Sequence, residues 1–178
     1  MSHPLVFRGR AWVLTGPDGR LISDIDTDMI FHNAHLAVTD LAEMAKYALG
    51  NLSGWKDFPQ KAGQGDIVIA GANFGCGSSR QQAVDCFRSL GIAALIAESF
   101  GAIYLRNAIN GGFPVGICRG LASFDPASPP VSSGDEVEAD FEAGRLVNLA
   151  TGAEIPGLAV WSDVQRDVHE AGGLLRMG

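Results

Sequence analysis

The stretch DIVIAGANFGCGSSRQQAVDCFRSLGIAALIAESFGAIYLRNAINGGFPVGIC, residues 66–118, carries the strongest indication of the fold. Two segments in it have the apolar periodicity of helices, and the second ends at a glycine pair. Three short apolar runs flank these segments and are typical of buried strands. The alternation of strands and helices predicts an α/β fold with a parallel βαβαβ core covered by helices. The expected strands are Asp66–Ala70, Ile92–Ala97 and Pro114–Cys118, and the expected helices are Ser79–Leu90 and Ser99–Ile109.

The sequence on either side of this core predicts additional elements. Before it, we expect Leu5–Leu14 to form a strand or strand pair interrupted by Gly9, and Asp40–Leu49 to form a helix. The segment 127–134 is predicted to be a loop and not a domain linker, because the chain after it is too short to fold alone. We therefore expect one domain, residues 1–178. The elements expected after the core are the hairpin Asp135–Phe141 and Arg145–Leu149 and the helix Asp163–Ala171 with Ser162 as its cap.

Composition and charge narrow the class of protein. The formal charge is −7, from 13 Lys and Arg against 20 Asp and Glu, which argues against nucleic acid or an anionic membrane as partner. It does not exclude a small anionic substrate held by local arginines. The first ten residues have no leader-like apolar stretch, and no run reaches the roughly 18 apolar residues of a membrane span. Three sparse cysteines favour a reducing compartment, the cytoplasm, and make a poor metal or cluster site.

The glycine-rich loop GANFGCGSSRQQA, residues 71–83, is the most informative candidate site. Free backbone N–H groups at a helix N-terminus attract anions, and glycines allow the backbone to approach a ligand closely. Arg80 adds a donor fork that matches a carboxylate or a phosphate. The alternative is a tight strand–helix turn with a serine cap and a surface arginine. The segment matches neither a P-loop nor a GxGxxG motif.

Two other polar clusters are weaker candidates. Arg106 and Asn110 lie four residues apart and share a helix face, although a helix stop at Asn110 explains the asparagine equally well. The acids Asp24, Asp26 and Asp28 alternate as calcium ligands do, but the glycine and glutamate of an EF-hand are missing, so we expect capping or Asx turns.

A nucleophilic Cys76 is a further alternative, in a stand-alone cysteine enzyme. The sequence fixes no histidine beside it, so this hypothesis has little support. The four histidines are scattered over the chain, at His3, His32, His35 and His169.

Three segments, in their order and spacing, resemble the small subunits of 3-isopropylmalate dehydratase, the swivelling domain of the aconitase family. They are DTDMI (26–30), GDIVIAGANFGCGSSR (65–80) and IAESFGAIYLRNAINGGFP (96–114), and the agreement covers residues 8–120. The resemblance implies a swivelling β/β/α domain that is half an enzyme. The other half, a large subunit, would carry the [4Fe–4S] cluster and its three cysteine ligands, so that this chain binds no metal.

The family reaction removes and re-adds water across the C2–C3 bond of a malate-like acid. The resemblance implies that Ser78 is the base, as an alkoxide steadied by backbone N–H groups. Ser79 would add an N–H group and a hydroxyl contact, and Arg80 would bind a substrate carboxylate. The cluster iron of the partner would act as Lewis acid. The residues expected to shape and support the site are Asp26, Asp28, Asn73, Gly75, Gly77, Arg106 and Asn110.

This chain departs from the family pattern at two places. Gln81 follows the Ser-Ser-Arg motif where many relatives have glutamate, so the resemblance implies that Arg80 or a neighbouring residue loses a carboxylate partner. The segment after DTDMI carries His35 where relatives have tyrosine, and Ala37 and Val38 where acceptors of an extra carboxylate have arginine. An apolar pocket there favours an alkyl malate over homoaconitate, because a buried carboxylate would lack a partner.

The function expected from these features is dehydration and rehydration of an alkyl-substituted malate, 3-isopropylmalate to 2-isopropylmalate in leucine biosynthesis. Two alternatives stay open beside the cysteine enzyme. One is the small subunit of a related hydratase, such as a dimethylmalate dehydratase or a homoaconitase acting on a di- or tricarboxylate. The other is a non-catalytic anion-binding module with the same fold.

Overall fold

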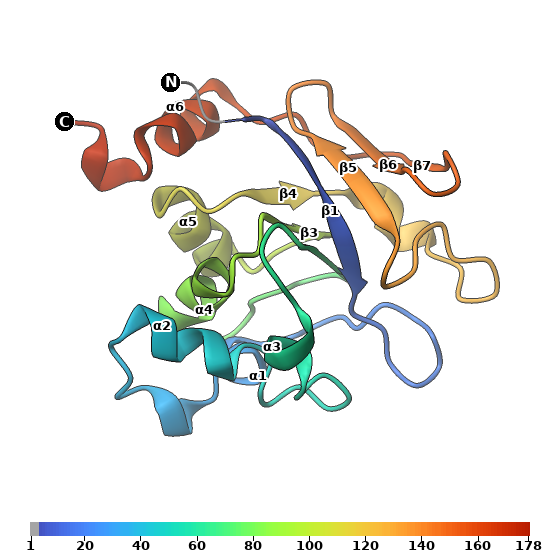
Figure 1. Ribbon diagram of the computed structural model, residues 1–178. Helices are drawn as coiled ribbons and strands as arrows, with labels where there is room; N and C mark the ends of the chain where they lie inside the picture. The colour runs from blue at the N-terminus through green and yellow to red at the C-terminus, as the bar shows by residue number, and fades with distance from the viewer. Residues whose placement is uncertain (1–3) are drawn as a thin grey trace.

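A seven-stranded sheet in the order β4-β3-β2-β1-β5-β6-β7 forms the centre of the protein (Figure 1). The computed structural model describes residues 4–178, so His3 lies outside the described residues. Strands β1 to β4 run parallel, and β5 to β7 continue the sheet antiparallel beyond β1. The α/β class and the parallel core are confirmed, with β1 as a fourth parallel strand. The strands are β1 Val6–Val13, β2 Ile67–Ala70, β3 Ala94–Ala97, β4 Val115–Ile117, β5 Glu136–Asp140, β6 Arg145–Asn148 and β7 Glu154–Ile155.

Strand β1 joins the two parts of the sheet. Its residues 6–10 pair with β5 and its residues 11–13 pair with β2. Gly9 does not interrupt the strand, so the expectation of a break there is wrong. Glycine is needed for a different reason, because a Cβ at position 9 would overlap the carbonyl oxygen of Gly65, where the chain enters β2.

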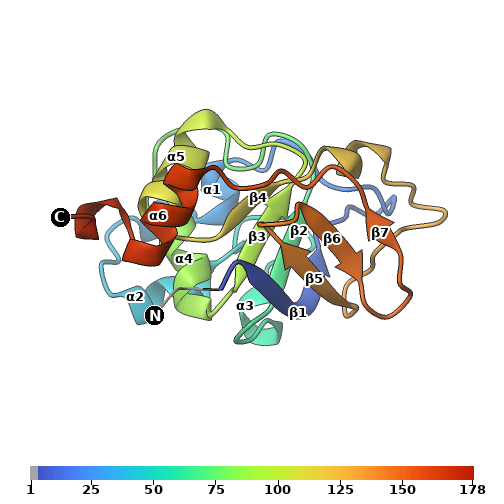
Figure 2. The same ribbon diagram turned by 90° about the horizontal axis from the view of Figure 1, so that it is seen from above.

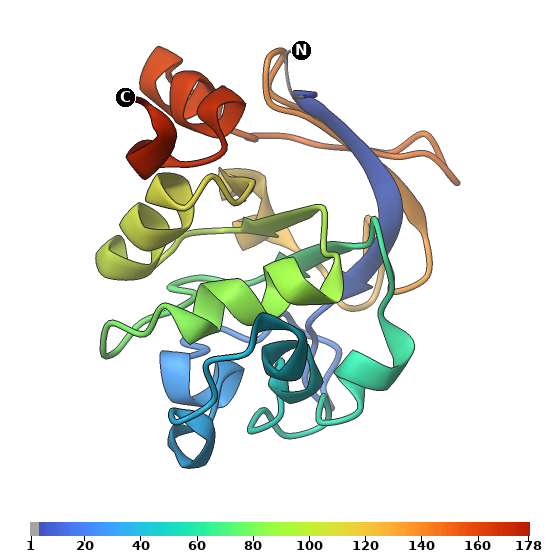
Figure 3. The same ribbon diagram turned by 60° about the vertical axis from the view of Figure 1, so that its left-hand side comes forward.

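The two longer internal helices, α4 and α5, cover one face of the parallel strands (Figure 3). This arrangement is a consequence of the strand order, because right-handed crossovers that all move the same way along a sheet leave their helices on one side. The antiparallel strands stand on the other side of the molecule (Figure 2). The helices are α1 Thr27–Ile30, α2 Leu41–Met44, α3 Phe58–Lys61, α4 Gln82–Leu90, α5 Ala102–Asn110 and α6 Asp163–Ala171.

Alternate residues of the same strands build two separate hydrophobic cores. Val68 and Leu95 are fully buried and face the helices, in what we call the helix-side core. Ile67 and Ile96 point the other way and pack with residues of β5 to β7, in the strand-side core. The sheet therefore curls so that its antiparallel part covers the face that the helices leave open.

The helix expected over Asp40–Leu49 is correct only for its first turns. Asp40 caps it by accepting from the Ala42 N–H group at 2.8 Å, but the α-helix ends at Met44 and a 3₁₀ turn follows. The chain then leaves the helical conformation, because Leu49 has φ +57° and its N–H group donates to the carbonyl of Ile30 at 2.8 Å. This tertiary bond overrides the local propensity.

The C-terminal third agrees closely with the expectations. The hairpin is formed by β5 and β6, and α6 spans the predicted residues with a capping box between Ser162 and Gln165. No helix within residues 4–178 is long and apolar enough to cross a membrane.

Candidate active site

Three loops meet at the carboxyl ends of β1, β2 and β3. The first comprises residues 14–26 after β1, the second follows β2, and the third comprises residues 98–101 after β3. The middle loop, residues 71–80, is joined to the first through a bond from the Thr27 N–H group to the Cys76 carbonyl at 2.9 Å. It is joined to the third through a bond from the Gly101 N–H group to the Phe74 carbonyl, also at 2.9 Å. Carboxyl ends of parallel strands are where open α/β sheets place their ligands. The glycine-rich loop therefore lies at the expected position for a site.

Two glycines give this loop its shape. Gly75 has φ +77° and Gly77 has φ +97°, a backbone region that side chains disfavour. A Cβ at Gly75 would overlap the ring of Tyr104, a buried residue of α5. The loop is thereby pressed against α5 on one side while its tip stays at the surface.

Ser78 lies at the exposed tip of the loop, together with Ser79. Helix α4 begins at Gln82, three residues later than predicted, so Ser78 is not part of its first turn. The backbone N–H groups of residues 77–80 donate to no acceptor within the described residues. Consecutive free N–H groups in a loop form a concave donor set suited to an anion, which is the environment that a serine alkoxide needs.

Asn107 of α5 contacts the Ser-Ser-Arg segment. The sequence marks Asn107 as one of three polar residues in an apolar helix, with Arg106 and Asn110, but gives it no role in the site. Its Nδ2 atom donates to the Ser79 Oγ atom at 3.1 Å. The only sign in the sequence of a role for Asn107 was a polar amide within an otherwise apolar helix. Its predicted neighbours are less well placed, because neither Arg106 nor Asn110 makes a hydrogen bond to residues 78–80 in the described part of the chain. Asn110 instead borders a surface hollow beside Leu174.

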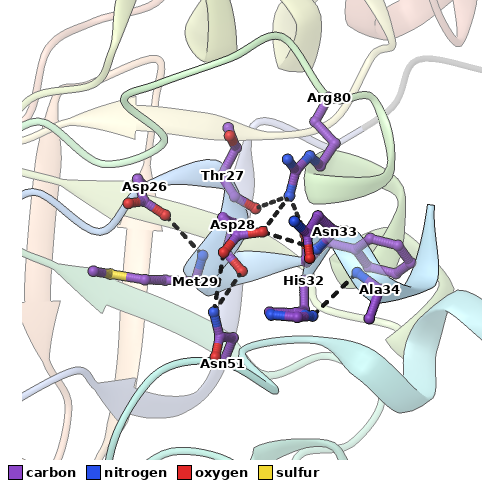
Figure 4. A network of polar contacts seen from close by, with 10 residues as sticks. Asp26, Thr27, Asp28, Met29, His32, Asn33, Ala34, Asn51 and Arg80 are labelled. Carbon is purple, nitrogen blue, oxygen red and sulfur yellow. Dashed lines mark hydrogen bonds and ion pairs between the residues drawn. The ribbon is translucent and has the colours of Figure 1, made fainter.

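Arg80 is held against α1 and is not a free surface arginine (Figure 4). Its Nη1 atom donates to the Phe31 carbonyl at 2.6 Å, to Asp28 Oδ1 at 3.1 Å and, more weakly, to the Thr27 carbonyl at 3.5 Å. Only 11% of the side chain is exposed. The Nε and Nη2 atoms have no acceptor among the described residues, yet they are not fully buried. One edge of the guanidinium is therefore fixed and the other is available to a carboxylate.

Asp28 is the carboxylate partner of Arg80. Its Oδ1 atom also accepts from the Asn33 N–H group at 2.8 Å, and its Oδ2 atom accepts from Asn51 Nδ2 at 3.2 Å. The hydrogen bond from the Asn33 backbone, followed by the one from Arg80, holds the pKa of Asp28 below its usual value. Asp28 is therefore charged at neutral pH. No local pattern could have indicated Asn51, since 23 residues separate it from Asp28.

Asp26 and Asn73 have supporting roles that the structure makes specific. Asp26 caps α1 by accepting from the Met29 N–H group at 2.8 Å, as the capping alternative predicted. Asn73 has φ +56°, and its Nδ2 atom donates to Asp24 Oδ1 at 2.8 Å. Its backbone N–H group donates to Ser99 Oγ, also at 2.8 Å. Asn73 thus holds all three loops together.

The segment expected to select the substrate lies beside the Ser-Ser-Arg loop. The Gln82 side chain of α4 donates to the Leu36 carbonyl at 3.4 Å. The His35 ring stacks on Tyr47 with centroids 3.8 Å apart and an interplanar angle of 16°. Ala37 is exposed, whereas Val38 is partly buried and packs against the helix-side core. Their role in binding substrate stays a prediction.

The departure at Gln81 does not leave Arg80 without a carboxylate, because Asp28 supplies it. The Gln81 side chain turns along the helix instead, and its Nε2 atom donates to Asp85 Oδ1 at 3.2 Å.

The three cysteines lie apart and have different environments. Cys86 and Cys118 are fully buried, in the helix-side and strand-side cores respectively. Burial raises the pKa of the Cys76 thiol, and the carboxylates of Asp24 and Asp26 raise it further. A reactive cysteine needs the opposite, electropositive surroundings, so this arrangement disfavours a Cys76 nucleophile. Within residues 4–178, no group of three His, Cys, Asp or Glu side chains is placed to hold a metal ion.

Comparison with known proteins gives matches over nearly the whole chain. Residues 30–117 match the family model of the aconitase C-terminal domain. The isopropylmalate/citramalate isomerase small subunit of Methanocaldococcus jannaschii is 37% identical, over 96% of this chain and 92% of the relative. The chain belongs to the family of 3-isopropylmalate dehydratase small subunits. The methanogen homoaconitase small subunit of Methanothermobacter thermautotrophicus is 36% identical, over 96% of this chain and 89% of the relative.

A solved structure of this family has the same fold. That of the 3-isopropylmalate dehydratase from Methanocaldococcus jannaschii matches with a TM-score of 0.79 and 34% sequence identity, over 96% of this chain and 92% of that chain. Membership of the family confirms the resemblance drawn from the three motifs. Because the family comprises small subunits, a large subunit is its expected partner.

Proposed function

We propose that this chain is the small subunit of a two-subunit hydro-lyase that dehydrates and rehydrates an alkyl-substituted malate. The isomerisation of 3-isopropylmalate to 2-isopropylmalate in leucine biosynthesis, in the cytoplasm, is the reaction we favour. The observation that carries the proposal is the Ser-Ser-Arg loop, in which an exposed serine among free N–H groups lies next to a fixed arginine.

Ser78 is the base in this proposal. It takes the proton from the carbon next to the substrate carboxylate while the hydroxyl group leaves the adjacent carbon. That carbon acid is weak, so the base must be strong, and a serine is strong only as its alkoxide. The N–H groups of residues 77–80 stabilise the alkoxide, since they have no competing acceptor in the described chain. The bond from Asn107 to Ser79 limits movement of the loop.

Arg80 binds a substrate carboxylate through its Nε and Nη2 atoms. The opposite edge is already fixed by the Phe31 carbonyl and by Asp28, so little side-chain freedom is lost on binding. A bidentate pair of this kind anchors the substrate carboxylate by two parallel hydrogen bonds.

The large subunit completes the site. Ser78 is exposed, so this chain cannot by itself exclude water from the alkoxide. The cysteines do not fit an iron–sulfur cluster, because such clusters need thiolate ligands close together, whereas Cys86 and Cys118 are buried in separate cores. We therefore assign the [4Fe–4S] cluster to the large subunit.

The substrate segment favours an alkyl group over a third carboxylate. Residues 31–38 contain no arginine or lysine, and Ala37 offers an exposed apolar surface. A carboxylate placed there would lose its hydration without gaining a cation. A homoaconitase activity is the second candidate, supported by the similarity to a homoaconitase small subunit.

The test is reconstitution with a cluster-bearing large subunit from the same organism, followed by turnover assays on isopropylmalate, dimethylmalate and homoaconitate. The chain alone should be inactive, and the pair should prefer an alkyl malate. Ser78→Ala should lower kcat by about 10³-fold, the usual contribution of a positioned base. Ser128→Ala, at an exposed position of the loop 127–134, is the control and should leave kcat unchanged.

Two outcomes would go against the proposal. Full activity of the Ser78→Ala pair would remove the base assignment. Binding of a malate analogue without turnover beside any large subunit would favour the anion-binding module.

A further inference from the structure

Asn51 contacts Asp28 twice, from a segment that is distant in sequence (Figure 4). Its Nδ2 atom lies 3.2 Å from Asp28 Oδ2 and 3.4 Å from the Asp28 carbonyl oxygen. Among the described residues, it is the hydrogen-bond donor to Oδ2, whereas Oδ1 accepts from the Asn33 backbone and from Arg80. The two oxygens of the carboxylate are thus fixed separately.

The backbone around Asn51 is firmly held. Leu49 is fully buried, and its N–H group donates to the Ile30 carbonyl at 2.8 Å, directly beside α1. Leu52, on the other side of Asn51, is also buried in the helix-side core. The backbone of Asn51 is therefore held on both sides, and its Nδ2 atom donates to Asp28 from a well-defined position.

Asp28 and the Phe31 carbonyl together set the orientation of Arg80, and Asp28 supplies the charged acceptor. With Oδ2 held by Asn51, the Oδ1 atom faces the guanidinium, and Nη1 bonds to Oδ1 and to the Phe31 carbonyl together. The Nε and Nη2 edge is then the one left for a ligand. Without Asn51, the Asp28 carboxylate is held through Oδ1 alone, by the Asn33 N–H group and Arg80, and it can turn about that oxygen because a carboxylate torsion has a broad energy profile. Arg80 would then lose the fixed direction of its charged acceptor.

We propose that Asn51 is a positioning residue, which orients Arg80 toward the substrate carboxylate by fixing the carboxylate of Asp28. This inference rests on the proposed function, since it assumes that Arg80 binds substrate. A neutral donor suits the role. A second carboxylate at position 51 would repel Asp28, and a cation there would compete with Arg80 for it.

The experiment measures steady-state kinetics of the reconstituted holoenzyme with Asn51→Ala and Asn51→Asp. Arg80 binds the substrate carboxylate alike in the ground state and the transition state, so its misplacement should raise KM and leave kcat nearly unchanged. We expect about a fivefold to tenfold higher KM for Asn51→Ala, with kcat within about twofold. Asn51→Asp should raise KM at least as much, although aspartate has the same size and shape as asparagine.

Asn148→Ala is the matched control. Asn148 is buried in β6, and its Nδ2 atom donates to the Asp135 carboxylate at 3.0 Å, so this variant removes the same kind of bond far from the site. It should lower the thermal midpoint without changing KM. An equal rise in KM for the control, wild-type kinetics of Asn51→Asp, or a fall in kcat at constant KM would overturn the proposal. Absence of turnover by the unmodified pair would instead reject the proposed function.

Discussion

Gly75 has φ +77°, and a Cβ added to it would overlap the ring of Tyr104. This close approach places the glycine-rich loop directly on α5, so the position of Ser78 three residues later depends on the absence of one methyl group. Residues with such a dual requirement, a left-handed backbone and no room for a Cβ, are costly to replace.

We therefore predict that Gly75→Ala lowers the free energy of unfolding by about 2–4 kcal/mol, from backbone strain plus overlap with the ring. The measurement is urea denaturation followed by fluorescence. Gly54→Ala is the control, because Gly54 has a similar φ of +84° and no atom within 4 Å of the added Cβ. Gly54→Ala should lower the free energy of unfolding by about 1 kcal/mol. Equal losses for the two variants would show that contact with Tyr104 is unimportant.

The contacts of Arg80 depend on segments that are distant in the sequence. The sequence predicted an arginine beside an anion site, but not that α1 would hold one edge of its guanidinium. The partner Asp28 is 52 residues away, so the pairing depends on the loops meeting in space. The same contact gives Arg80 a carboxylate partner although a glutamine, Gln81, follows it in the sequence.

At the scale of elements, Asp66 fastens the start of β2 to β1. Its Oδ2 atom accepts from Arg10 Nη2 at 2.8 Å, from Trp12 Nε1 at 2.7 Å and from the Gly63 N–H group at 2.8 Å. Burial raises the pKa of this carboxyl, but the hydrogen bonds outweigh burial and hold the pKa below its usual value of 3.8. The carboxylate is thus charged, nearly buried and shared between two adjacent strands.

Asp66→Asn should lower the free energy of unfolding by about 2 kcal/mol at pH 7, since hydrogen bonds to a buried charge are stronger than neutral ones. Because the pKa is lower in the folded state, the carboxylate stabilises fully above about pH 4 and loses its effect as the pH falls through the folded value. The difference between variant and wild type should therefore shrink at about pH 3. Denaturant titrations of the variant and the wild type, at pH 7 and at about pH 3, measure this difference.

The exposed pair Asp57 and Lys61 provides the control for this prediction. Both side chains are largely exposed, at 59% and 60%, so Asp57→Asn should leave the free energy of unfolding almost unchanged. A loss for Asp66→Asn that is the same under acidic and neutral conditions would show that the charge of Asp66 contributes nothing.

The boundaries of elements were predicted less well than their existence. Helix α6 spans the predicted residues because Ser162 and Gln165 cap it locally. Helix α4 begins three residues late, because the preceding loop is bound to its neighbours through Gly75, Asn73 and Arg80. Local caps can be read in a sequence, whereas contacts between loops cannot.

In the whole molecule, the exposed Ser-Ser-Arg loop and its free N–H groups are typical of a surface that a partner covers. Amide hydrogen exchange should therefore be fast over residues 77–80 in the isolated chain, since these groups have no acceptor among the described residues. Adding the large subunit with a substrate analogue should slow it strongly, as measured by mass spectrometry of the peptide that contains Ser78.

The turn between β5 and β6, at the opposite end of β1, is the reference in the same experiment. Its exchange should not change on addition of the partner. Unaltered exchange at residues 77–80, in a complex that is otherwise formed, would contradict the placement of the active site at this surface.

Local periodicity, caps and glycines were enough to predict the parallel βαβαβ core, the C-terminal hairpin, the last helix and the Ser-Ser-Arg loop as the candidate site. Contacts between distant segments place β1 beside the parallel strands and bring Asp28, which Asn51 holds, to Arg80. Those outcomes arise from hydrogen bonds between segments that lie 23 to 56 residues apart. Such bonds form only when the sheet brings the ends of its strands together, and no local pattern specifies them.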